Sequence, residues 1–172
     1  MRYSARADKP ADVTVTALRE SLEAVVRELG LALIELDVFR TKVRKGSPQA
    51  PPGVSMAVQV RAIVYKPGPL GTDDCTRVHR AILPRLEQAF PGGEFSVEVS
   101  TPGINRIVKD GVELAHYRGR GVRLWRTDIS DWSAGLLEAA DEYGIIIRGK
   151  EEMIRLDYAI VAKARLDPSQ EE

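Results

Sequence analysis

The sequence predicts an α+β protein in two parts: a layer of two helices on a three-stranded sheet, followed by a small β-barrel. Three observations predict this fold. Apolar residues recur every three or four positions in two segments, which is typical of helices with one buried face. They alternate with polar residues in several others, which is typical of strands. Beyond residue 100, short alternating segments follow one another closely, with few helical patterns between them.

The first predicted helix runs from about Thr16 to Leu29. Thr14 or Thr16 is expected to cap its start, and Gly30 suits the left-handed position that ends it. Its apolar face consists of Leu18, Leu22, Val25, Val26 and Leu29.

Alternation then predicts strands at 34–38 and 56–65, joined by a basic loop at 41–54. A second helix follows, capped by Thr72, in which Pro84 is expected to produce a kink or an interruption. A third strand covers 95–99. The order helix, strand, strand, helix, strand favours two helices packed on one sheet face.

In the second half, a short helix is expected at 112–117. Strands are expected at 121–127, 133–140, 144–148, 150–156 and 161–166, and Gly149-Lys150 is a hairpin signal between two of them. This organisation predicts a disordered tail at 1–12, an N-terminal domain at 13–101, and a C-terminal domain at 102–172 that includes the linker and an acidic tail.

Composition excludes several classes of protein. The chain has 172 residues, 44% of them hydrophobic, which is enough for a core. No apolar run is long enough for a membrane span, and the N-terminus lacks a signal peptide, so no membrane partner is expected. With Cys75 as the single cysteine, no internal disulfide is possible, and the reducing cytoplasm is the expected location. The 25 basic and 25 acidic residues argue against a protein that binds nucleic acid by bulk charge alone.

Enzymatic chemistry finds little support in the residues. Cys75 and His79 are four positions apart and could share a helix face, but no third group that would orient the imidazole is evident. No set of residues has the spacing of a zinc site. We therefore expect a protein that is not an enzyme, without cofactor, metal or small-molecule substrate.

Two basic clusters are candidate contacts to RNA or protein. The first lies on the loop between the first two strands and contains Arg40, Lys42, Arg44 and Lys45. The second surrounds the first strand of the barrel, with Trp132 nearby, and contains Arg118, Arg120, Arg123, Trp125 and Arg126. Arginine beside an aromatic ring suits phosphate contact combined with base stacking. A solvated strand face is the simpler interpretation of both clusters.

The sequence Gly68-Pro69-Leu70-Gly71 matches a KH-type GxxG loop only superficially, because Pro69 removes an amide, and a plain turn is favoured.

The most distinctive stretch joins the two predicted domains. Pro102 restricts φ, and Gly103 accepts a positive φ, so a tight turn is expected directly after the third strand. Thr101, Pro102 and Gly103 are therefore the predicted hinge. Arg106 lies at the junction, where it could tie the domains together or face a partner.

The stretch Val97-Glu98-Val99-Ser100-Thr101-Pro102-Gly103-Ile104-Asn105-Arg106 resembles the V-E-V-S-S-P-G-L-D-R signature of the ribosome maturation factor RimP family. Three other segments are similar to the family in the same order: Gly30 to Val38, Thr72 to Cys75, and Ile160 to Leu166. The resemblance covers about residues 15–167.

The resemblance implies an αββαβ, KH-like N-terminal domain and an Sm/SH3-like C-terminal barrel. It also implies a factor for maturation of the small (30S) ribosomal subunit. The implied partners are the immature subunit, a small-subunit ribosomal protein near the decoding region, and 16S rRNA. The positions that carry over from the signature are Glu98, Ser100, Pro102, Gly103 and Arg106.

Two signature positions differ in this chain. Thr101 replaces serine and keeps the hydroxyl, whereas Asn105 replaces aspartate and loses a charge, so an ion pair from that position to Arg106 is unavailable. Two other functions remain open. One is a free-standing RNA-binding module, and the other is an enzyme that uses Cys75 and His79, which a buried thiol would exclude.

Overall fold

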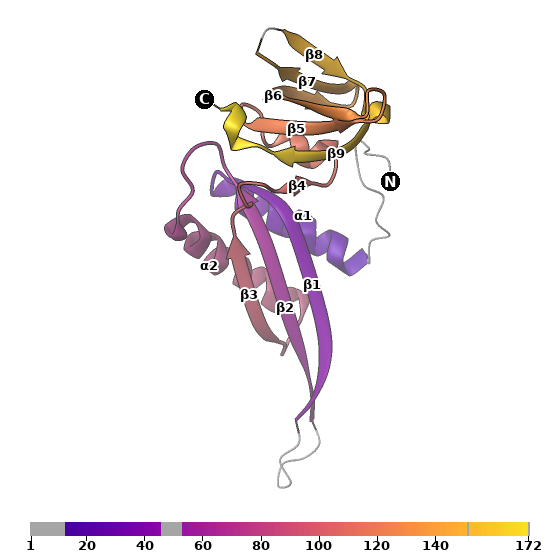
Figure 1. Cartoon of the computed structure of the whole chain (residues 1–172). Helices are drawn as coiled ribbons and strands as arrows, with labels where there is room; N and C mark the ends of the chain where they lie inside the picture. The colour runs from indigo at the N-terminus through magenta and orange to yellow at the C-terminus, as the bar shows by residue number, and fades with distance from the viewer. Residues whose placement is uncertain (1–12, 46–52, 151, 172) are drawn as a thin grey trace. The chain divides into compact units, whose positions relative to one another are not determined.

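The computed structural model describes residues 13–45, 53–150 and 152–171. The described residues divide into two compact units with their boundary between Pro102 and Gly103, called here the N-terminal unit (from 13 to 102) and the C-terminal unit (from 103 to 171). Both combine helices with β-sheet, which confirms the predicted α+β class (Figure 1). The tail predicted at 1–12 lies outside the described residues.

The N-terminal unit has a three-stranded sheet of order β1-β2-β3, in which β1 and β2 are antiparallel and β2 and β3 are parallel. Both helices cover the same face of this sheet (Figure 1). The elements are α1 (Val13–Glu28), β1 (Ala32–Lys45), β2 (Gly53–Tyr65), α2 (Thr72–Ala89) and β3 (Glu94–Ser100).

The alternation of β2 explains why the sheet has one buried face. Val58, Val60, Ala62 and Val64 are each at most 1% exposed, whereas Gln59 and Arg61 point to solvent. The buried side chains meet the apolar faces of both helices, and burial of each large aliphatic side chain contributes about 1.5–3 kcal/mol. From the helices the core receives Leu18, Leu22, Val26, Val78, Ile82 and Leu86.

Both predicted helix caps are wrong. α1 begins at Val13, so Thr14 and Thr16 lie inside the helix. The residue that caps α2 is Gly71 rather than Thr72, because the carboxylate of Asp74 accepts a hydrogen bond from the Gly71 backbone N–H at 3.1 Å. This bond satisfies the Gly71 amide, which would otherwise lack a partner at the helix start.

Two other local predictions also need correction. Pro84 does not interrupt α2, which runs unbroken to Ala89; the proline is exposed, so the carbonyl that loses its partner can bind water. The basic loop expected at 41–54 is shorter, because β1 continues to Lys45 and β2 begins at Gly53. The two strands therefore extend beyond β3, which pairs only with Ala57–Ile63 (Figure 1).

The C-terminal unit has a six-stranded sheet of order β4-β9-β5-β6-β7-β8, and every ladder in it is antiparallel. Its helical elements are α3 (Gly111–Ala115) and two 3₁₀ turns at Tyr158–Ile160 and Pro168–Gln170. The strands are β4 (Ile107–Val108), β5 (Gly121–Arg126), β6 (Asp131–Asp141), β7 (Gly144–Arg148), β8 (Met153–Leu156) and β9 (Val161–Leu166).

The small barrel predicted for this unit corresponds to one six-stranded antiparallel sheet that no ladder closes. In the described part of the chain, the outermost strands β4 and β8 are short and no ladder joins them. Short edge strands limit the pairing that closure of a sheet requires. The predicted hairpin between these last strands is present, because β7 and β8 pair antiparallel, but its connection is longer than the expected Gly149-Lys150 turn: Arg148 pairs with Met153, so it spans 149–152.

The turn expected at Pro102-Gly103 lies one step later. Gly103 is not among the glycines with positive φ. Instead, the backbone N–H of Arg106 donates to the carbonyl of Gly103 at 3.0 Å, and this bond closes a turn over Gly103–Arg106. The freedom of glycine is therefore not what bends the chain at this point.

The close packing of β6 against β7 makes a testable prediction. A methyl group added at Gly135 would overlap the backbone carbonyl of Arg148, which cannot rotate away. We expect Gly135→Ala to lower the free energy of unfolding by about 1–3 kcal/mol, measured by urea denaturation. Gly103→Ala is the control, because no heavy atom lies within 4 Å of its added methyl group. Equal stability of the two variants would contradict this account of the sheet.

Candidate functional site

The signature residues are distributed over both units. Glu98 and Ser100 belong to β3, and the exposed Glu98 forms an ion pair with Arg61 at 3.2 Å. Asn105 is exposed in the turn that precedes Arg106 in the C-terminal unit. Of the predicted hinge residues, Thr101 and Pro102 end the N-terminal unit and Gly103 begins the C-terminal one. The signature therefore does not form one cluster within either unit.

Arg106 has a structural environment within the C-terminal unit. Its guanidinium is ion-paired with Glu113 of α3, and the two side chains are only 11% and 6% exposed. The other Glu113 oxygen accepts the backbone N–H of Lys109 at 3.0 Å. The Tyr117 hydroxyl donates to the same carboxylate at 3.2 Å. These three donors accommodate the negative charge of Glu113 inside the C-terminal unit, so loss of any of them would leave the charge poorly compensated.

The same cluster connects the signature to the last strand. The backbone carbonyl of Arg106 accepts the N–H of Leu166, at 2.9 Å, at the end of β9. Burial of Tyr117, together with the neighbouring Glu113 carboxylate, raises the pKa of the Tyr117 phenol far above its ordinary value. The phenol therefore remains a hydrogen-bond donor at any physiological pH.

Most of the predicted arginine cluster is engaged in internal ion pairs. Arg120 pairs with Glu171 at 2.7 Å. Arg123 pairs with Asp167 at 2.8 Å, and Arg126 pairs with Asp128 at 2.5 Å. Arg118 is exposed after α3. The sequence places these arginines together, but it does not show that nearby carboxylates neutralise three of them.

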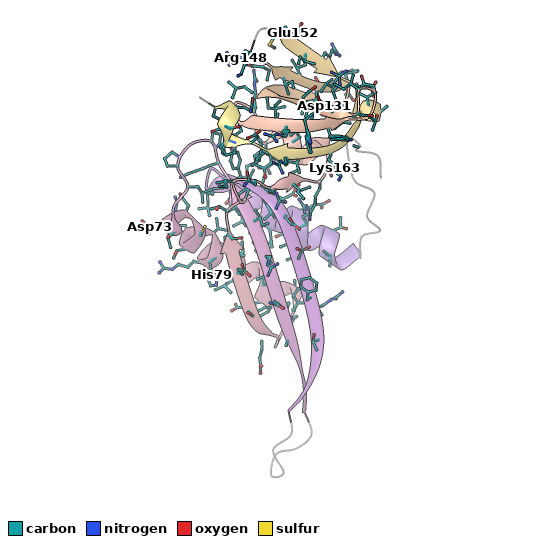
Figure 2. The ribbon with its side chains drawn as sticks, viewed as in Figure 1. Asp73, His79, Asp131, Arg148, Glu152 and Lys163 are labelled. Atoms are coloured by element: carbon teal, nitrogen blue, oxygen red, sulfur yellow. The ribbon has the colours of Figure 1, made fainter. Side chains whose placement is uncertain are left out.

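A set of side chains that overlaps this cluster combines cationic and aromatic groups on one face of the sheet. The Trp125 and Trp132 rings meet edge to face, with centroids 5.4 Å apart. The guanidinium groups of Arg123 and Arg165 lie 5.9 Å and 5.6 Å from the centre of the Trp132 ring. Lys163 is exposed on β9, opposite Trp125 (Figure 2). We call these five residues the Trp132 surface.

Arg165 differs from the other arginines of this surface. Its Nε is buried and has no hydrogen-bond partner, and neither Arg165 nor Lys163 has an ion pair among the described residues. No carboxylate of the described residues neutralises these two charges, whereas the buried Nε atom itself is out of reach of an external anion. The cation–π contacts with Trp132 hold the Arg165 guanidinium in place.

The sequence analysis missed Lys163 and Arg165 as members of this surface. Lys163 and Arg165 alternate with the buried Ala164 and Leu166, so the sequence does indicate that the two basic side chains share the outer face of a strand. The missing information was the pairing of β9 with β5, two strands that are distant in sequence. That pairing places Arg165 beside Arg123 and Lys163 beside Trp125.

The structure gives less support to a binding role for the basic cluster predicted between the first two strands. The guanidinium of Arg40 lies 5.7 Å from the centre of the Phe90 ring at the end of α2. The side chains of Lys42, Arg44 and Lys45 lie outside the described residues.

Neither a thiol enzyme nor a metal centre finds support. Burial, with the nearby Asp74 carboxylate, raises the pKa of the Cys75 thiol, which is the opposite of what a thiolate nucleophile requires. His79 is partly buried on α2 (Figure 2). In the described parts of the chain, no three His, Cys, Asp or Glu side chains are grouped to hold a metal ion. No helix found there is long and apolar enough to cross a membrane.

The Gly68 to Gly71 segment is a turn between β2 and α2, and the Asp74 carboxylate lies in the first turn of that helix. Asp74 accepts from the Gly71 amide and forms an ion pair with Lys66 at 2.8 Å. These contacts lower the pKa of Asp74, with the Lys66 interaction as the main cause. A carboxylate already occupies the position that a phosphate would take, which favours the plain turn.

Comparison with known proteins assigns the chain to a family. Residues 51–105 match the family model described as the RimP N-terminal domain. A ribosome maturation factor RimP from Borrelia turicatae is 31% identical over 145 residues, which cover 84% of this chain and 90% of the relative. The chain belongs to the RimP family. Relatives of the same name from Borrelia hermsii and Rippkaea orientalis are each 28% identical, over 84% and 83% of this chain and 90% and 88% of their own length.

The buried cluster around Arg106 predicts a large effect of a small substitution. Glu113→Gln leaves the guanidinium of Arg106 buried without its counter-charge, which costs about 3–5 kcal/mol. Glu138→Gln is the matched control, because the pair of Glu138 with Arg148 is exposed and contributes about 0–1 kcal/mol. Urea unfolding of both variants measures the difference, and a similar small loss in both would show that the buried pair stabilises little.

The environment of Asp167 predicts an acid-sensitive contribution to stability. Hydrogen bonds from Ser169, and then the Arg123 ion pair, lower the pKa of Asp167 from its ordinary value of 3.8. As the pH falls, the Asp167 carboxylate is therefore protonated at a higher pH in the unfolded chain than in the folded protein. The stabilisation is complete above about pH 5 and is lost as the pH falls through the lowered native value.

Asp167→Asn should therefore flatten the pH dependence of stability below pH 5, as measured by urea unfolding at a series of pH values, relative to the unmodified protein. An unchanged slope in that range would show that Asp167 does not carry the effect.

Proposed function

We propose that this protein is a non-enzymatic assembly factor that binds immature small (30S) ribosomal subunits and assists their maturation. The observation that carries the proposal is the match to a ribosome maturation factor RimP over 84% of the chain and 90% of the relative. The raised pKa of the Cys75 thiol supports a binding protein over a thiol enzyme.

The Trp132 surface is the proposed contact to 16S rRNA. Aromatic rings beside guanidinium and ammonium groups suit a nucleic-acid backbone with unpaired bases. Arg165 and Lys163 supply the positive charge, whereas Arg123 is held by Asp167 and contributes mainly to the shape of the surface. The equal numbers of basic and acidic residues support a composite site that also includes a ribosomal protein near the decoding region.

The mechanism is a difference in affinity between two states of the subunit. A factor that binds an immature arrangement more tightly than the mature one increases its population and is released once maturation removes that preference. Thr101, Pro102 and Gly103 are the proposed hinge between domains at 13–101 and 102–172, and the boundary of the compact units between Pro102 and Gly103 supports this placement. We place the protein in the cytoplasm, where ribosomal subunits assemble.

A free-standing RNA-binding module is the second candidate, and the Trp132 surface favours it as well. The two functions differ in salt dependence. A module that binds RNA through phosphates loses affinity steeply with salt and needs no ribosomal protein. High affinity of the purified protein for naked 16S rRNA, equal to its affinity for immature subunits, would support this alternative.

Sedimentation with immature small subunits tests the proposed contact. We expect Arg165→Glu to weaken association by about tenfold, because it places a carboxylate where a phosphate would bind. Arg155→Glu on the edge strand β8 makes the same change of net charge and is the control, with less than about a twofold effect. Sucrose-gradient sedimentation of the tagged full-length protein measures both. Equal association of the two variants would exclude the Trp132 surface, and no association of the unmodified protein would overturn the proposed function.

A further inference from the structure

The face of the N-terminal sheet opposite the helices is polar, exposed and arranged in regular rows. The strand register places Asp37, Arg61 and Glu98 in one row across the sheet. The next row contains Phe39, Gln59 and Ser96. Phe39 is 58% exposed, although phenylalanine is usually among the more buried residue types. We call this surface the open sheet face.

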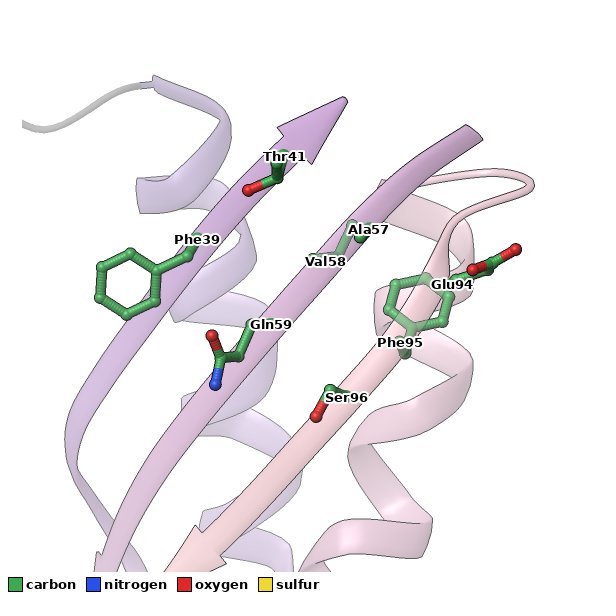
Figure 3. A pocket seen from close by; sticks show the side chains of 8 residues that line it. All are labelled: Phe39, Thr41, Ala57, Val58, Gln59, Glu94, Phe95 and Ser96. Carbon is green, nitrogen blue, oxygen red and sulfur yellow. The ribbon is translucent and has the colours of Figure 1, made fainter. Parts of the chain in front are cut away.

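A shallow pocket of about 490 Å³ lies at one end of the open sheet face (Figure 3). Phe39 and Thr41 of β1, Gln59 of β2, and Glu94 and Ser96 of β3 contribute to its lining. The pocket is therefore bordered by an exposed aromatic ring on one edge strand and a carboxylate on the other.

The charges on this face select the kind of partner. Carboxylates outnumber basic residues in these rows, with Glu35 and Asp37 on β1 and Glu94 and Glu98 on β3 against Arg61, whose guanidinium forms an exposed pair with Glu98 at 3.2 Å. Such a face repels the phosphates of a nucleic acid and attracts a polycation. The Trp132 surface has the opposite character, so the two surfaces suit different partners.

The spacing of the carboxylates fits an extended chain. Residues two apart on one strand face the same side and lie about 6.6 Å apart, which is also the spacing of alternate side chains in an extended peptide. Glu35 and Asp37 are two apart on β1, and Glu94, Ser96 and Glu98 follow the same alternation on β3. A bound segment with basic residues at alternate positions could therefore meet successive carboxylates.

We propose that the open sheet face binds an extended, lysine- and arginine-rich protein segment. Phe39 packs on the aliphatic portions of the basic side chains, Asp37 pairs with a charged end, and Glu98 exchanges its weak, exposed pair with Arg61 for one with the segment. The surface is distinct from the one proposed for RNA. Its binding activity can be measured without ribosomal subunits, so its failure and the failure of the proposed function are separate outcomes.

The probe is a short fluorescein-labelled peptide of alternating arginine and serine, titrated with the full-length protein and followed by fluorescence anisotropy. We expect Asp37→Asn combined with Glu98→Gln to weaken binding by about five- to tenfold, because two exposed charge pairs are lost. Phe39→Ala is expected to weaken it by about threefold. Glu20→Gln combined with Glu87→Gln removes two exposed charges from α1 and α2, which cover the opposite face of the sheet, and should change the affinity by less than about twofold.

Three results would overturn the proposal: no binding of the peptide to the unmodified protein, equal weakening by the helix control, or a labelled oligouridylate that binds the unmodified protein and is weakened by Phe39→Ala. The last result would make the face an RNA surface. Unchanged thermal unfolding of each variant ensures that a loss of affinity reports the face and not the fold.

Discussion

The buried carboxylate of Glu113 is the constraint on which the C-terminal unit depends. A charge in this position is tolerated only because Arg106, the Lys109 amide and the Tyr117 hydroxyl all donate to it. These bonds join the signature turn to α3, and the Arg106 carbonyl also receives the Leu166 amide of β9. The cluster thereby fixes the end of the strand that carries Arg165. The signature arginine has a structural role that local sequence cannot distinguish from a binding role.

The two units present surfaces of opposite character. In the C-terminal unit, cross-strand pairing brings cationic side chains of β9 beside the tryptophans of β5 and β6. In the N-terminal unit, helices cover one face of the sheet, and the other face exposes carboxylates around Phe39. The two proposed contacts, one to RNA and one to a basic protein segment, are compatible with equal numbers of basic and acidic residues, because each uses a local surface of one charge.

The arginines show why residue type alone is a poor guide to a binding site. Arg120, Arg123 and Arg126 are close in sequence and look like a cationic patch, but each has a carboxylate partner, two of them contributed by the last residues of the chain. Arg165, isolated in sequence, retains a buried Nε without a partner. An ion pair formed within the protein reduces what a guanidinium can offer to an external phosphate, so the available charge depends on the fold.

The sequence alone determined what depends on local periodicity and on the signature: the α+β class, the main helices and strands, the buried faces of α1 and β2, and the family. Only the tertiary structure decided what depends on contacts between distant segments. It placed β9 beside β5, left the six-stranded sheet without a closing ladder, and buried Arg106 against Glu113. Alternation reports which side of a strand faces the core, whereas the choice of neighbouring strand depends on the packing of the whole sheet, which no short window of sequence contains.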